Sequence, residues 1–110
     1  KGTQWNRLCQ WTNYNSIHTG RKYGVECWTK ATEGTRAYVH ASILTNGSEP
    51  VGEIQLSPTK STPTGWVLYK GSGVAPDFRS EKSGRIRVDI GVDSNSGVAW
   101  FDHIWVGEEK

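Results

Sequence analysis

The feature of this sequence that most restricts its fold is a series of short segments in which apolar and polar residues alternate. The clearest is the segment 85–92, "RIRVDIGV", in which Ile86, Val88, Ile90 and Val92 occupy every second position. A period of two places such residues on one face of a β-strand. Thirteen Gly and four Pro separate the segments, and the sequence predicts almost no helix.

Seven segments of this kind predict seven short strands joined by turns. They cover residues 5–12, 22–31, 35–45, 51–57, 66–74, 85–92 and 98–106. Short strands at regular intervals are typical of a two-sheet antiparallel β-sandwich or of a barrel. A chain of 110 residues is long enough for one domain with a thin core. We therefore expect one all-β domain over residues 1–110.

Charge and motifs argue against several classes of function. The chain has 13 Lys and Arg against 11 Asp and Glu, a net charge of +2. This balance gives no case for binding nucleic acid or an anionic membrane, and no apolar run approaches the roughly 20 residues that span a bilayer. The acidic residues are scattered, and no nucleophile elbow, zinc-protease motif, phosphate loop or Cys/His array is present. We predict that the protein is not an enzyme.

Three motifs follow one another over residues 20–106. The stretch "GRKYGVECWTKA" has the form G-x-x-Y-x-x-x-x-W-x-K-A, "GWVLYKGSGVAP" contains W-x-x-Y, and "RIRVDIGVDSNSGVAWFDHIWV" ends in aromatic-aromatic-Asp-x-aliphatic. Together they resemble the jelly-roll carbohydrate-binding modules of the xylan- and β-glucan-binding type, which are appended to bacterial polysaccharide-degrading enzymes. Such modules usually have further strands before the one that residues 9–11 match. The resemblance thus implies a short variant of the jelly roll, or a missing strand that comes from elsewhere.

The resemblance also implies a function. We expect a secreted or cell-surface monomer, fused to a glycoside hydrolase or lyase, that binds a polysaccharide or oligosaccharide without acting on it. Glucans, xylans, mannans and galactans stay open as ligands, and the two Arg of the segment 85–92 with the three His of the chain leave an acidic polysaccharide open. The alternative is a structural or protein-interaction β-sandwich of a surface or phage-tail protein. A sugar-binding sandwich should expose at least two Trp or Tyr in a row, whereas a spacer should bury its rings.

Strand alternation predicts which side chains face outward. Trp28 alternates with apolar residues in the segment 22–31, and Tyr38 does so in the segment 35–45. If these strands are neighbours in one sheet, the two rings form a platform on which a sugar stacks. The predicted polar partners are Glu26, His40 and Arg87, and Trp105 is expected to be exposed as well. Trp5, Trp11 and Tyr14 form an alternative aromatic cluster near the N-terminus.

The closing strand carries an acid between aromatic rings. By the resemblance, Asp102 matches the acid that holds a structural Ca²⁺ in many such modules, and Ca²⁺ takes six to eight oxygen ligands. The alternative is an Asp that is hydrogen-bonded to the backbone at a strand end. Strict alternation places Trp100 on the face of Ile104 and Val106, so we expect Trp100 to pack inward. Trp66 is expected in the core.

The chain has two cysteines, Cys9 and Cys27, and no C-x-x-C motif. Two cysteines alone do not make a zinc site. Both are predicted in strands that flank one loop, so a Cys9–Cys27 disulfide is expected if the protein is secreted. Two buried thiols are the alternative.

Overall fold

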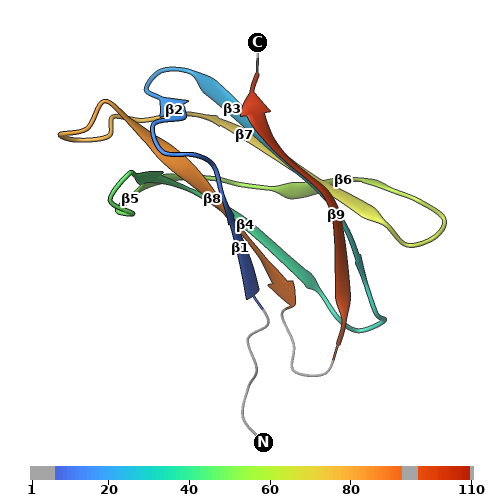
Figure 1. The fold of residues 1–110 in the computed structure, drawn as a ribbon. Helices are drawn as coiled ribbons and strands as arrows, with labels where there is room; N and C mark the ends of the chain where they lie inside the picture. The colour runs from blue at the N-terminus through green and yellow to red at the C-terminus, as the bar shows by residue number, and fades with distance from the viewer. Residues whose placement is uncertain (1–6, 93–96, 110) are drawn as a thin grey trace, which may run out of the picture.

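The fold is seen in a computed structural model that describes residues 7–92 and 97–109. These residues form nine strands: β1 (Arg7–Trp11), β2 (Ile17–His18), β3 (Lys22–Ala31), β4 (Ala37–Thr45), β5 (Pro50–Ile54), β6 (Ser57–Ser61), β7 (Val67–Val74), β8 (Ser83–Val92) and β9 (Ala99–Glu108). The strands pair antiparallel in two sheets that pack face to face (Figure 1). The predicted all-β, two-sheet antiparallel β-sandwich is therefore confirmed.

The order of the strands shows how the chain moves between the sheets. The first sheet has the order β1-β8-β4-β5, with β2 also paired to β8, and the second sheet has the order β6-β7-β3-β9. The connection from β3 to β4 passes from the second sheet to the first, and the connection from β8 to β9 passes back. Strands that are neighbours in the sequence therefore often lie in opposite layers. No helix of the described residues is long and apolar enough to cross a membrane.

Two strands, β6 and the two-residue β2, lie where loops were expected. The predicted strand 51–57 ends at Ile54, and β6 begins at Ser57 and continues into the segment "PTKSTPTG" that follows. Every residue of β6 is exposed, so the segment has no apolar alternation to mark it. As an edge strand, β6 tolerates Pro58, whose missing N–H would break the ladder of a central strand.

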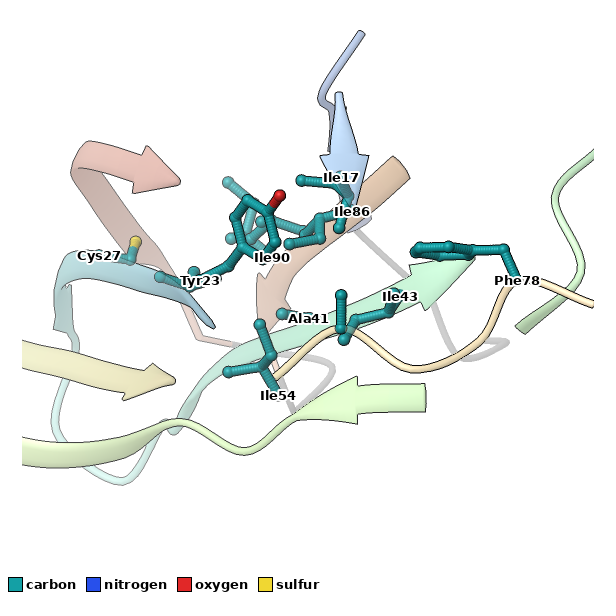
Figure 2. Packing of buried hydrophobic residues seen from close by; sticks show 12 residues of the cluster. Ile17, Tyr23, Cys27, Ala41, Ile43, Ile54, Phe78, Ile86 and Ile90 are labelled. Atoms are coloured by element: carbon teal, nitrogen blue, oxygen red, sulfur yellow. The ribbon is translucent and has the colours of Figure 1, made fainter. Parts of the chain in front are cut away.

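The core is a layer of apolar side chains between the sheets. It is built from the buried residues Ile17, Tyr23, Val25, Cys27, Ala41, Ile43, Ile54, Ala75, Phe78, Ile86, Val88 and Ile90. Figure 2 shows Phe78 reaching from the loop between β7 and β8 to one end of this cluster, beside Ile43, while Cys27 lies toward the other end. Phe78 is fully buried, so a single loop residue closes that end of the core.

The two cysteines lie on opposite sheets, and neither forms a disulfide in the described part of the chain. Cys9 is on β1, on the outer side of the first sheet, and its thiol donates a hydrogen bond of 2.8 Å to Asp89 Oδ1. Cys27 is on the core side of β3, where burial raises the pKa of its thiol to about 11. The predicted disulfide is wrong because the strands that carry the cysteines belong to different layers and Cys9 faces away from the core.

The two thiols should differ in reactivity. In native protein, we expect a thiol-specific reagent such as DTNB to modify exposed Cys9 and to leave Cys27 unmodified, because Cys27 is buried and holds its proton at neutral pH. Full denaturation should release the second thiol. A Cys9→Ser variant identifies which thiol reacts first. A native protein with no titratable thiol would contradict this structure.

Removal of the Phe78 ring should destabilise the fold strongly. We expect Phe78→Ala to lower the free energy of unfolding by about 3–5 kcal/mol, because it leaves a cavity at the end of the core. Phe78→Leu keeps most of the volume and should cost less. Urea unfolding followed by Trp fluorescence measures both variants. A loss of less than about 1 kcal/mol for Phe78→Ala would show that the loop does not seal the core.

Candidate functional site

The pairing of β9 with β3 contains a β-bulge. Trp105 pairs with Glu26 and Asp102 pairs with Trp28, so β9 advances three positions where β3 advances two. The extra residue lies around His103, whose φ of 52° is in the left-handed region. A bulge of this kind inserts one residue into a strand, so the side chains beyond the bulge point to the opposite faces from those that strict alternation predicts.

The bulge determines which rings of β9 face outward. Phe101 and Ile104 both pack against the core, and Trp100, Asp102 and Trp105 face the other way. Trp100 is 47% exposed and Trp105 is 43% exposed. Trp105 is therefore exposed as expected, whereas the expectation that Trp100 packs inward is wrong, because strict alternation does not hold across the bulge.

Four of the six Trp gather on the outer side of the second sheet. We call the surface formed by Trp28, Trp66, Trp100 and Trp105 the tryptophan face. Trp28 lies on the outer side of β3, as predicted, between the buried residues Cys27 and Thr29. It is half-buried. Lys30 pairs with Trp100 and Glu26 pairs with Trp105, so charged side chains alternate with the rings on this face.

A hollow of about 260 Å³ lies within the tryptophan face. Its lining residues come from β3, from β9 and from the β6–β7 turn: Trp28, Thr62, Thr64, Trp66, Asp102 and His103. Trp66 was expected in the core but is half-buried at this hollow. The turn holds it there, because the Trp66 N–H donates to Thr62 Oγ1 at 3.1 Å and its carbonyl accepts from the Thr62 N–H at 2.8 Å. The hollow combines two indole rings with hydroxyl and carboxylate oxygens.

Asp102 is an exposed carboxylate at the rim of this hollow. Its Oδ1 accepts a hydrogen bond of 2.9 Å from the His103 N–H, and its Oδ2 lies 3.6 Å from His103 Nε2. Within residues 7–92 and 97–109 no group of three or more His, Cys, Asp or Glu side chains is placed to hold a metal ion. Among the described residues, the side chains around Asp102 do not supply the six to eight oxygen ligands that Ca²⁺ takes. Calcium binding stays a prediction, and we assign calcium no role at this face.

The charges beside the rings are paired with each other. Glu26 Oε2 lies 3.6 Å from Lys70 Nζ, and both residues lie on the outer side of the second sheet, where they are neighbours in register. An exposed pair of this kind adds little to stability. Its effect is to leave this part of the tryptophan face close to neutral.

The other predicted site residues lie on the opposite sheet. Tyr38, His40 and Arg87 face outward from β4 and β8 of the first sheet, so the predicted platform of Trp28 and Tyr38 does not form. The cause is the connection 32–36, which carries the chain from one sheet to the other. Tyr38 stacks on His40 with ring centroids 6.2 Å apart, and Arg87 Nε donates to Asp89 Oδ2 at 3.1 Å.

The His40 ring contacts a carboxylate on the neighbouring strand β5. Its Nε2 lies 3.0 Å from Oε2 of Glu53 on β5. The hydrogen bond with His40, helped by one from Gln55, lowers the pKa of the Glu53 carboxyl. His40 and Arg87 therefore both face carboxylates of their own sheet.

A larger hollow of about 420 Å³ lies between the β1–β2 segment and the end of β9. Trp11, Thr12, Asn13, Ser16, Tyr23 and Glu108 are among its lining residues. Tyr23 is buried and its hydroxyl oxygen accepts a hydrogen bond of 2.8 Å from the His18 N–H, which leaves Trp11 as the one exposed ring among these lining residues. The hollow itself therefore does not bring two exposed rings together, whereas the tryptophan face does.

No protein-family model matches this chain, and comparison with curated proteins and with solved structures gives no match either.

Sequence reasoning missed Trp66, Trp100 and the two Thr residues of the hollow. For Trp66 a signal existed, since "TPTG" before it is a turn sequence between two strands and predicts the β6–β7 hairpin. For Trp100 there was none, because His103 is not a residue that marks a bulge in the way that Gly does. Trp5, part of the alternative cluster, lies outside the described residues.

The bulge can be tested at His103. A β-branched residue is strained at positive φ, so we expect His103→Val to lower the free energy of unfolding by about 1 kcal/mol or more. His103→Gly should leave it unchanged or raise it, because Gly adopts this conformation freely. The His103 side chain is 80% exposed, so its removal alone costs little. Equal stability of the two variants in urea unfolding would show that β9 has no bulge at this position.

Proposed function

We propose that this protein is a non-catalytic carbohydrate-binding module that binds a polysaccharide at the tryptophan face. One observation carries the proposal. Two exposed indole rings lie on the same outer face as a hollow that is lined by two further indoles, a carboxylate and two hydroxyls. The motif resemblance supports the same class of function.

The chemistry of the face suits a sugar ring. The apolar C–H side of a pyranose stacks on a flat aromatic ring, while its hydroxyls need hydrogen-bond partners at the ring edge. In the hollow, Trp28 and Trp66 supply the rings, and Asp102, Thr62 and Thr64 supply acceptor and donor oxygens. A purely apolar interface would not need these polar groups beside the rings.

The length of the face favours a polymer over a single sugar. Trp100 and Trp105 pair with Lys30 and Glu26, four residues apart on β3. At a rise of about 3.3 Å per residue, this separation corresponds to about 13 Å along the strand. The stacking surface is therefore longer than one sugar ring, and a chain of sugars crosses it from Trp100 past the hollow to Trp105.

The biological effect of such binding is a higher local concentration. A module that is fused to a glycoside hydrolase or lyase holds the enzyme near its substrate, and weak binding suffices for this gain. Such a role belongs to a secreted or cell-surface protein. The alternative of a structural spacer is less favourable, because a spacer has no reason to leave two Trp rings on one strand in contact with water.

The proposal is tested by removing the rings one at a time. Affinity gel electrophoresis against xylan, β-glucan, mannan and galactan identifies the ligand. We then expect Trp100→Ala and Trp28→Ala to weaken its binding about thirtyfold, the effect of losing about 2 kcal/mol at a central aromatic contact. Trp100 is the safer variant for the fold, because its ring is about half exposed.

Two further results bear on the proposal. Val74→Ala removes exposed apolar surface at the far end of β7 and should leave binding unchanged. Tyr38→Ala on the other sheet distinguishes the faces. Loss of binding in Tyr38→Ala with full binding in Trp100→Ala and Trp28→Ala would overturn the assignment to the tryptophan face, and a failure of every polysaccharide to retard the parent protein would overturn the function itself.

A further inference from the structure

We propose a second binding site, on the outer side of the first sheet, for a sugar that carries a carboxylate. The site is formed by Arg85 with the rings of Trp11 and Tyr14, which we call the Arg85 stack. It lies on the opposite sheet from the tryptophan face and does not depend on that face for binding.

Three contacts hold the Arg85 guanidinium in place. Its Cζ atom lies 4.3 Å from the centroid of the Trp11 ring and 4.0 Å from the centroid of the Tyr14 ring. Its Nε donates a hydrogen bond of 3.1 Å to the Thr12 carbonyl. The cation is thereby fixed against two aromatic rings, an arrangement that cation–π attraction favours.

Among the described residues, Arg85 differs from Arg87 and Arg79 in having no carboxylate partner. Arg87 pairs with Asp89 at 3.1 Å and Arg79 pairs with Glu49 at 3.3 Å. No Asp or Glu side chain of residues 7–92 and 97–109 forms a salt bridge with Arg85. A guanidinium has five N–H donors, and the Nε–H···Thr12 bond uses one of them. The remaining donors are available for a ligand.

The chemistry of the stack indicates what the ligand carries. A planar guanidinium binds a carboxylate through two parallel hydrogen bonds. Trp11 is 37% exposed and Tyr14 is 64% exposed, so both rings keep surface on which the C–H side of a sugar can stack. A uronate sugar combines the two requirements, because its carboxylate is attached to a pyranose ring.

The surroundings favour an acidic sugar over a nucleic acid. Binding to a phosphate backbone gains its affinity from several cations that contact successive phosphates. Here the adjacent Arg87 is already neutralised by Asp89, so the stack presents one guanidinium that no carboxylate of the described residues neutralises, instead of a track of cations. A single carboxylate at one fixed position matches this distribution of charge.

Sodium polygalacturonate, a linear polymer with a carboxylate on each sugar, is the probe that tests the site, and its fully methyl-esterified form is the neutral control. By isothermal titration calorimetry or affinity electrophoresis we expect the protein to bind the acid form and not the ester. Arg85→Gln should weaken this binding about tenfold or more. Binding should also weaken as the salt concentration rises.

The controls separate a site from general attraction between charges. Arg79→Gln makes the same change in net charge at another exposed position and should leave polygalacturonate binding unchanged. If Arg85→Gln does not fold, as judged by circular dichroism, Tyr14→Ala decides instead. It changes an exposed loop ring and should weaken binding about threefold or more.

Several results would overturn the proposal: no binding of polygalacturonate, equal binding of the acid and the ester, an equal loss in Arg85→Gln and Arg79→Gln, or tighter binding of single-stranded DNA than of polygalacturonate. Each of these is measured with a probe that differs from the neutral polysaccharides used for the tryptophan face. Failure of one proposal is therefore distinguishable from failure of the other.

Discussion

The pairing of β3 with β9 is the interaction on which the outer surface of the second sheet depends. β3 is a central strand whose inward residues are fully buried, so its own alternation is strongly determined by the core. β9 is an edge strand, and the bulge at His103 lets Phe101 and Ile104 both reach the core. The residues left over, Trp100 and Trp105, face the solvent. The core thus determines the position of the rings outside it.

The parts of the fold that the sequence predicts are those where burial and alternation agree. The segment 85–92 alternates cleanly, and β8 is the central strand of the first sheet that β1, β2 and β4 pair with. The parts that it does not predict depend on neighbours that are distant in the sequence. β6 has no apolar residue facing the core and exists because β7 pairs with it. The bulge exists because two strands that are more than seventy residues apart must both fill one core.

The largest difference between expectation and structure comes from one short connection. Trp28 and Tyr38 are both on outer faces, as alternation predicts, yet residues 32–36 carry the chain across the core between them. Strand periodicity tells which face of a strand a residue occupies but not which sheet the strand joins. The same limit applies to the cysteines: Cys9 and Cys27 lie in the predicted strands, and the assignment of those strands to different sheets separates them.

Both proposed sites hold their rings in place before any ligand arrives. On the second sheet the Trp105 ring lies over Gly107, where a Cβ atom would collide with the indole. On the first sheet Arg85 contacts the rings of both Trp11 and Tyr14. Ordering a free side chain on binding costs about 0.5–1.5 kcal/mol, and rings that are already fixed avoid much of that cost. A shallow surface makes fewer contacts with its ligand than a deep pocket does, so it has less contact energy to offset the cost of ordering side chains. Rings that are fixed in advance therefore matter more on a shallow surface. The glycine beside Trp105 and the cation between Trp11 and Tyr14 are therefore two different solutions to the same requirement, a rigid aromatic surface on a small sandwich.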